Sequence, residues 1–130
     1  MAIAEGKVLE FKSPDTVDNS ILETFPYSGP KQRVQYSTNE FTAVCPFSGL
    51  PDIGSVTIDY MPGNKCVELK SLKYYLLSYR DVGIYQEHVT AKLYEDISKV
   101  LQAQEMTLTV VYQTRGGIDT VCKIDSNEQK

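Results

Sequence analysis

Histidine and cysteine are scarce in this sequence of 130 residues, which contains one histidine, His88, and three cysteines, Cys45, Cys66 and Cys122. A structural zinc site takes about four such ligands, so we expect no metal centre. The cysteines are odd in number and form no CxxC pair, which argues against a disulfide framework. At least one thiol is therefore free for other chemistry.

Long apolar runs and blocks of like charge are also missing. No stretch approaches the roughly 20 apolar residues of a membrane span, and the N-terminal segment lacks the apolar core of a signal peptide. The formal net charge is −4, from 13 basic and 17 acidic residues, which gives no support to non-specific binding of nucleic acids or anionic membranes. We expect a cytoplasmic protein with one core, because 130 residues suit a single domain.

Hydrophobic periodicity predicts the secondary structure. Apolar residues recur at steps of three or four in residues 67–81 and 85–102, which predicts two amphipathic helices. Alternating or β-rich patterns predict strands, with a bend at Asn39 and a Gly-Gly hairpin turn before the last of them. The predicted strands are residues 33–38, 40–45, 55–62, 106–114 and 117–124.

The order of these elements, β-β-α-α-β-β, predicts an α+β fold in which an antiparallel four-stranded sheet carries two helices on one face. We expect one domain over residues 31–125, preceded by an arm or loop at residues 1–30 and followed by a polar tail at residues 126–130. Such a sheet leaves two edges open, and pairing of these edges between copies would close a ring. We therefore expect a homo-oligomer.

The segment "VCPFSGLPD", residues 44–52, places Cys45 at the end of a predicted strand, where Pro46 turns the chain out of the sheet. Asp52 follows through a Gly/Pro turn that could bring it back to the thiol. Two interpretations stay open: a buried cysteine beside a turn-capping aspartate, or a nucleophile with its proton donor. Thiol catalysis needs a base or a positive field, which His88 or a lysine could supply.

Charged residues at the predicted helices also have two interpretations. Lys70, Lys73 and Arg80 fall within about 80° of one another around the first predicted helix. They form either a solvated helix face or an anion site. The sequence has no GxGxxG or GxxxxGK[ST] motif, so a dinucleotide would bind neither at a Rossmann site nor at a P-loop. Glu87 suits the first turn of a helix, but its carboxylate could also accept two N–H donors from a purine-like edge.

Several stretches together resemble one known family. Residues 68–80, "ELKSLKYYLLSYR", are similar to the signature of the NADPH-dependent 7-cyano-7-deazaguanine reductases of the short QueF type. "FTAVCPFSGLPD", "QEH" and "TRGGID" follow in the family's order and spacing, and the resemblance covers about residues 30–120. It implies the tunnelling fold, rings that are commonly two stacked pentamers, NADPH as co-substrate and no metal.

The resemblance also implies a reaction. Cys45 would attack the nitrile of 7-cyano-7-deazaguanine to give a covalent thioimide, and Asp52 would protonate the new nitrogen. Hydrides from two NADPH would then give the aminomethyl product, a precursor of queuosine in transfer RNA. An acid is needed beside the nitrogen, so we expect burial or a nearby negative charge to hold Asp52 protonated near neutral pH.

The same resemblance implies the binding residues. Glu87 would hold the amino and ring N–H edge of the substrate and Gln86 would hydrogen-bond the substrate, in a pocket that is also lined by Val67, Glu68 and Leu69. The part of the signature associated with NADPH contains Lys70, Ser71 and Lys73, and phosphate binding by the two lysines is our inference. Many relatives have a histidine at the position of Gln86, whereas the single histidine of this chain is His88, whose role is open.

Three alternatives remain. An archaeal relative adds ammonia to the same nitrile on modified tRNA without NADPH, but it lacks the signature at residues 68–80. A non-catalytic purine-binding protein of the same fold would bind without a covalent adduct. A pterin enzyme of this fold usually relies on several histidines, and His88 is alone. We expect no direct contact of this protein with nucleic acid or membrane.

Overall fold

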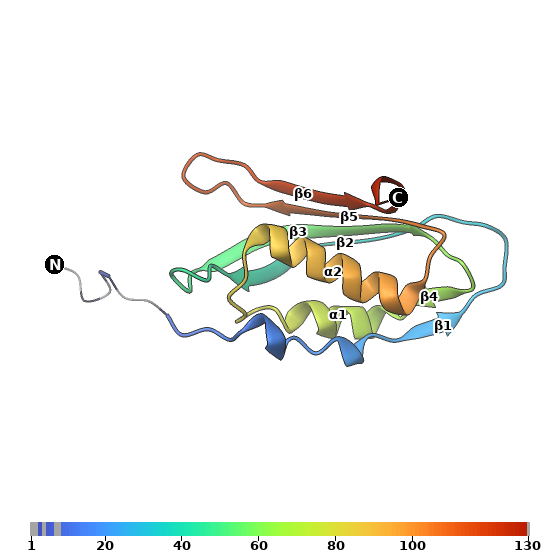
Figure 1. Cartoon of the computed structure of the whole chain (residues 1–130), viewed down its shortest axis with the longest axis horizontal. Coiled ribbons are helices and arrows are strands. Elements are labelled where there is room, and N and C mark those ends of the chain that lie inside the picture. Colours follow the sequence, from blue (N-terminus) through green and yellow to red (C-terminus); the bar gives the residue numbers. More distant parts are fainter. Residues whose placement is uncertain (1–2, 4, 7–8, 130) are drawn as a thin grey trace.

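The computed structural model describes residues 3, 5, 6 and 9–129, which form an antiparallel sheet covered on one face by two helices (Figure 1). The sheet has the spatial order β2-β3-β5-β6. Its strands are β2 (Val34–Val44), β3 (Pro51–Met61), β5 (Glu105–Tyr112) and β6 (Val121–Asp125). The helices are α1 (Leu69–Leu77) and α2 (Gln86–Leu101). The predicted element order and the antiparallel sheet with helices on one face are confirmed.

Smaller elements complete the chain. The short strands pair antiparallel with each other beside the main sheet and are β1 (Thr24–Pro26) and β4 (Lys65–Val67). The single-turn 3-10 helices are η1 (Pro14–Thr16), η2 (Asn19–Ile21) and η3 (Ser126–Glu128). Within the part of the chain that the structure describes, no helix is long and apolar enough to cross a membrane.

The first long strand differs from its prediction. Residues 33–38 and 40–45 were expected as two strands with a bend at Asn39, but β2 runs through both and carries a β-bulge between Thr38 and Phe41. A bulge places an extra residue on one strand only, so the pairing of β2 with β3 resumes beyond it. The polar bend residues therefore mark a bulge, and the prediction of a strand break is wrong.

The first helix and the last strand are shorter than predicted. The Glu68 carboxylate accepts hydrogen bonds from the backbone N–H groups of Lys70 (2.8 Å) and Ser71 (2.9 Å), so it caps the helix and α1 begins at Leu69. Strand β6 begins at Val121 rather than residue 117. The preceding loop contains Gly116 and Gly117 at φ +58° and +77°, a left-handed conformation that interrupts a strand.

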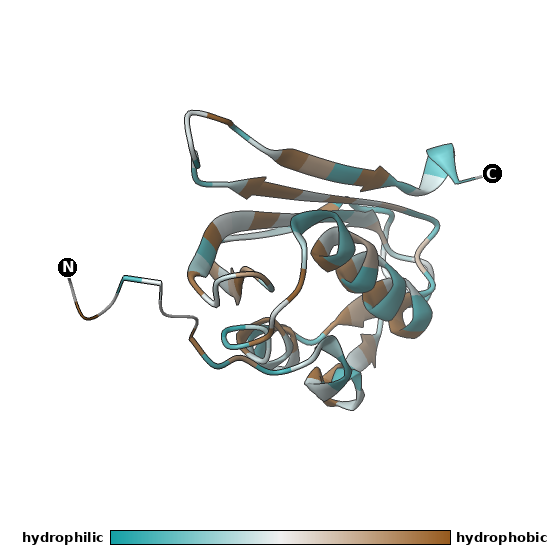
Figure 2. Cartoon of the chain, turned by 60° about the vertical axis from the view of Figure 1, so that its left-hand side comes forward, coloured by the Kyte–Doolittle hydropathy of each residue, from teal (hydrophilic) through white to brown (hydrophobic). Residues whose placement is uncertain are grey.

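The core lies between the helices and the sheet. Val56, Ile58 and Tyr60 of β3 alternate with more exposed residues and face the helices, as a strand with one buried face requires. Figure 2 shows hydrophobic and hydrophilic residues in alternating bands along the helices, which each bury one side. The helices contribute the buried residues Leu72, Tyr75, Val89, Leu93, Ile97 and Leu101, and Tyr79 is buried in the turn after α1.

The described part of residues 1–30 lies along α1 in Figure 1. Val17 and Leu22 belong to the core, and the Glu23 N–H donates to Oγ of Ser71 (3.0 Å). Residues 1, 2, 4, 7 and 8 of the expected arm, and Lys130 of the expected tail, lie outside the described residues.

Candidate active site

A cavity of about 300 Å³ opens beside Cys45, where four segments of the chain meet. The end of β2 and the start of β3 form one side, and the first turn of α2 forms another. The loop between β5 and β6, residues 113–120, closes the third. The lining residues are Cys45, Pro46, Asp52, Tyr85, Gln86, Glu87, Arg115, Ile118 and Thr120. We call this cavity the thiol pocket.

The backbone on both sides of Cys45 is fixed by hydrogen bonds. The Cys45 N–H donates to the Leu50 carbonyl and the Cys45 carbonyl accepts from Gly49 N–H, both at 2.8 Å, which closes a tight turn. Gly49 has φ +75°, and a side chain there would collide with the Leu9 carbonyl, so only glycine suits this turn. The position of the thiol therefore follows from the short Gly/Pro turn.

The thiol of Cys45 is half-buried and chemically activated. Hydrogen bonds from the backbone N–H groups of Ser48 and Phe47 lower the pKa of the Cys45 thiol and outweigh its partial burial. The positive charge of Arg115 lowers this pKa further. The thiolate, which is the nucleophilic form, is thus favoured by the turn itself and by an arginine. His88 is exposed, packs beside Tyr85 with ring centroids 6.1 Å apart, and is not part of the pocket lining.

Asp52 lies buried in the same pocket and forms an ion pair with Arg115, whose Nη1 donates to Oδ1 of the carboxylate. The expected burial of Asp52 is present, whereas the neighbouring cation was not expected. Asp52 thus shares one cavity with a thiol and with the guanidinium of Arg115.

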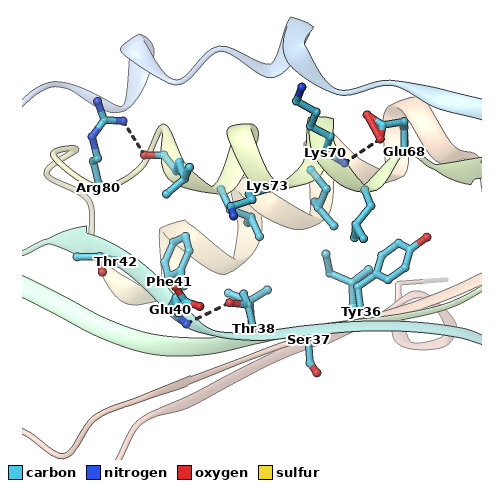
Figure 3. A pocket seen from close by; sticks show the side chains of 16 residues that line it. Tyr36, Ser37, Thr38, Glu40, Phe41, Thr42, Glu68, Lys70, Lys73 and Arg80 are labelled. Carbon is cyan, nitrogen blue, oxygen red and sulfur yellow. Dashed lines mark hydrogen bonds between the residues drawn. The ribbon is translucent and has the colours of Figure 1, made fainter.

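A second cavity, of about 620 Å³, lies between α1 and β2. Figure 3 shows α1 above this groove and β2 below it; Lys70 of α1 and Arg80 of the turn after α1 extend away from the strand, and Lys73 lies between them. The apolar lining includes Tyr36 and Phe41 of β2 and Leu72 of α1. We call this cavity the α1 groove. It shares no lining residue with the thiol pocket.

The sequence-predicted residues fall into two groups. Cys45, Asp52, Gln86 and Glu87 come together in the thiol pocket. The residues that line the α1 groove instead are Glu68, Leu69, Lys70 and Lys73.

Val67 and Ser71 line neither cavity. Val67 is buried in β4, where its carbonyl accepts from the Tyr36 hydroxyl (3.2 Å). The Ser71 hydroxyl donates to the Glu68 carbonyl (2.7 Å), so it is already engaged within α1.

Five lining residues of the thiol pocket were not assigned as site residues from sequence: Pro46, Tyr85, Arg115, Ile118 and Thr120. Arg115 is the chemically important one, because its charge acts on both Cys45 and Asp52. Its motif "TRGGID" was noted in the sequence, but only the β5–β6 hairpin brings it to the pocket.

The sheet with its two helices and a pocket that pairs a thiol with a carboxylate define a QueF-like protein with the tunnelling fold. The family model described as "QueF-like protein" matches residues 51–130. The fold matches the crystal structure of "the archaeosine synthase QueF-Like in the apo form" with a TM-score of 0.66 and 22% identity, over 77% of this chain and 96% of that one. At that identity the likeness concerns the fold.

Curated relatives are more similar. The NADPH-dependent 7-cyano-7-deazaguanine reductases of Thermotoga petrophila and Thermotoga maritima are each 49% identical over all of this chain and 96% of their own length. That of Thermoanaerobacter pseudethanolicus is 48% identical over 82% of this chain and 81% of its own. The chain belongs to the family of NADPH-dependent 7-cyano-7-deazaguanine reductases, which confirms the resemblance seen in the sequence.

Proposed function

We propose that this protein reduces the nitrile of 7-cyano-7-deazaguanine to an aminomethyl group with two NADPH, a step in queuosine biosynthesis. The relatives that match along its whole length carry the name of this reductase. The observation that carries the proposal is the thiol pocket, where a cysteine of lowered pKa and a buried aspartate lie together. We place the reaction in the cytoplasm.

The first step is attack of the Cys45 thiolate on the nitrile carbon. The C–S bond forms as one π bond of the nitrile breaks, and the nitrogen takes up a proton to give a thioimide. A soft thiolate suits this electrophilic carbon, and lowering the thiol pKa raises the thiolate fraction near neutral pH. Two hydrides from two NADPH, with protons, then complete the four-electron reduction and release the thiol.

The proton for the nitrile nitrogen comes from Asp52. An ionised Asp52 can accept the proton of the Cys45 thiol and then give it to the nitrogen, so the same carboxyl acts first as base and then as acid. The carboxylate is held by its ion pair with Arg115. Because a guanidinium has no acceptor, Arg115 has to leave the carboxyl oxygen that takes up the proton.

Glu87 and Gln86 provide the recognition of the purine-like ring. Glu87 stands exposed in the first turn of α2 and lines the thiol pocket. Its carboxylate can accept two hydrogen bonds from the amino group and the ring N–H of the substrate, and Gln86 adds a side-chain amide next to it. We propose that Glu68 and Leu69 of a neighbouring copy, with Val67 of that copy behind them, complete the substrate pocket.

The α1 groove suits NADPH as co-substrate. Lys70 and Lys73 supply cations for its phosphates along an apolar groove, and Ser71 holds the start of α1 that carries them. Because this groove and the thiol pocket share no residue, we propose that they work together between copies in a ring of subunits, commonly two stacked pentamers. The open edges β2 and β6 support such pairing.

The test is to mix the protein with 7-cyano-7-deazaguanine and NADPH. We expect about two NADPH oxidised per nitrile, because one nitrile takes up two hydrides. Without NADPH, we expect intact-mass measurement to show a covalent adduct that is lost in Cys45→Ala. No NADPH oxidation would refute the reductase. Tight binding without adduct would indicate a binding protein, and ammonia addition without NADPH would indicate the archaeal type of reaction.

A further inference from the structure

The hydroxyl of Tyr112, at the end of β5, has no hydrogen-bond partner although it is buried. Tyr112 is 4% exposed, and among the described residues its Oη is the one buried side-chain nitrogen or oxygen without a partner. A buried hydroxyl normally has a partner, since leaving it unsatisfied is destabilising. The other fully buried tyrosines follow this rule: the Tyr75 hydroxyl donates to Asp96 (2.6 Å) and that of Tyr60 accepts from the Val67 N–H (3.1 Å).

The sheet register places Tyr112 beside Asp52. Tyr112 pairs with Gly54 of β3, so their side-chain positions lie on the same face. A Cβ at Gly54 would lie 3.3 Å from Cδ1 of Tyr112, so the ring occupies the space that the glycine leaves. Asp52 is two positions before Gly54 on the same strand and therefore shares this face, as the nearest polar side chain along it.

Electrostatics agree with this placement. Burial raises the pKa of the Tyr112 hydroxyl, and negative charge nearby raises this pKa further. The groups that contribute the charge are Cys122, Asp52, Glu87 and Tyr79. Two of these, Asp52 and Glu87, are the acidic residues of the thiol pocket. The hydroxyl thus lies near the pocket carboxylates, on the core side of the sheet.

The carboxylate of Asp52 has a free position for a second donor. Arg115 donates to Oδ1, and within the described residues no hydrogen bond reaches Oδ2. Arginine can hold Asp52 only while it is ionised, because a guanidinium has no acceptor. A tyrosine hydroxyl can donate to the carboxylate and can also accept from the carboxylic acid. A carboxyl group that gains and loses a proton in one turnover needs a partner, such as a hydroxyl, that can both donate and accept a hydrogen bond.

We propose that Tyr112 is a positioning residue for Asp52: its hydroxyl bonds the carboxyl group through one bound water and holds it through both protonation states while Arg115 is displaced. This inference rests on the proposed function, in which Asp52 is both base and acid. Tyr112 does not need to touch the substrate. It keeps the proton of Asp52 directed to the reacting nitrogen.

The test compares Tyr112→Phe with Tyr75→Phe, which also removes a buried hydroxyl but one that bonds Asp96 of α2. The carboxyl of Asp52 is followed by NMR in ligand-free protein with ¹³C-labelled aspartate, and its signal is assigned with Asp52→Asn. A hydroxyl donates more strongly to the ionised form, so we expect the titration midpoint of Asp52 to rise by about 0.7 pH unit, a five-fold change in proton affinity, in Tyr112→Phe alone.

Two further measurements sharpen the result. The melting temperature of Tyr112→Phe should fall by less than that of Tyr75→Phe, because the Tyr112 hydroxyl has no direct partner in the chain whereas the Tyr75 hydroxyl donates to Asp96. The rate of adduct formation at Cys45 should drop about ten-fold in Tyr112→Phe. An unchanged Asp52 midpoint, an equal shift in both variants, or a loss of stability like that of Tyr75→Phe would overturn the proposal. If the wild type forms no adduct, the proposed function fails, and the titration still decides the role of Tyr112.

Discussion

Arg115 donates a hydrogen bond to the carboxylate of Asp52 across 63 positions of sequence. The Asp52 side chain is 6% exposed and that of Arg115 is 46% exposed, so the ion pair joins the buried floor of the thiol pocket to its rim. Arg115 stands on a loop with two glycines in the left-handed conformation. The exposed partner of this ion pair therefore lies on the loop between β5 and β6, and the buried partner lies on β3.

Replacement of Arg115 should reduce the reactivity of the Cys45 thiol and remove the ion-pair partner of Asp52. In Arg115→Ala we expect adduct formation with the nitrile to slow about ten-fold or more, because the cation that favours the thiolate is gone. Arg33→Ala is the matched control, since Arg33 forms its ion pair with Asp59 outside both cavities. The rate is followed by intact-mass measurement. Equal rates in Arg115→Ala and wild type would contradict this role.

Alkylation of Cys45 should follow its lowered pKa. We expect the rate with iodoacetamide, read at the Cys45 peptide, to reach its plateau at a lower pH than that of an ordinary thiol. Because the pKa of the thiol is lower in the folded protein, the unfolded chain binds more protons between the two values. The stability of wild type relative to Cys45→Ala should therefore rise with pH across that interval. A relative stability that fell there would have the wrong sign.

Lysines of the α1 groove should affect NADPH and not the thiol. For Lys70→Ala and Lys73→Ala we expect the KM for NADPH to rise by about ten-fold, the effect of one lost charge-assisted contact to phosphate. Adduct formation in the absence of NADPH should stay at the wild-type rate. Lys99→Ala, at the far end of α2, serves as the control. A slower adduct step in the groove variants would show that the groove acts in substrate attack.

The turn after Cys45 should depend on Gly49. Gly49→Ala puts a side chain at φ +75° against the Leu9 carbonyl, and we expect a loss of about 1–3 kcal/mol in stability together with slower alkylation of Cys45. Gly116→Ala has the same left-handed strain at φ +58° but nothing within 4 Å, so it should cost about 1 kcal/mol and leave the thiol unchanged. Urea unfolding measures both. Equal losses in the two variants would show that the contact with Leu9 is unimportant.

The helices are joined by a buried hydrogen bond that can be removed cleanly. Tyr75→Phe deletes the donor to the Asp96 carboxylate, and we expect a loss of about 1.5–3 kcal/mol, typical of a hydrogen bond to a charged group. Tyr74→Phe, one position earlier on the exposed side of α1, should change stability by less than about 0.5 kcal/mol. Denaturant unfolding distinguishes them, and a neutral Tyr75→Phe would mean that Asp96 finds another donor.

Periodicity was sufficient to predict the sheet and helices because the buried faces follow regular steps of two and of three or four residues. Val56, Ile58 and Tyr60 mark the core side of β3 in sequence and in structure. The bulge in β2 was not predictable in this way. Polar residues at a bend and at a bulge look alike in sequence, and only pairing with β3 distinguishes them.

The site was predictable where its residues are close in sequence. Cys45 and Asp52 belong to one turn, so their proximity could be inferred. Arg115 could not be assigned, because its contact with Asp52 depends on the pairing of β3 with β5. The ion pair of Asp52 was not predicted for the same reason. A sequence shows which charges exist, but the strand order decides which of them meet.

The segment that begins at Leu9 has a consequence for how a newly made chain matures. The Leu9 N–H donates to the Ser48 carbonyl in the loop after Cys45, and Lys12 bonds Asp81 and Gly83. During synthesis the N-terminal segment emerges first and can bond Ser48 once that residue has left the ribosome, but its bonds to Asp81 and Gly83 have to wait until α1 has been made. The segment is therefore fixed at both of its contact points only after the first helix has been synthesised.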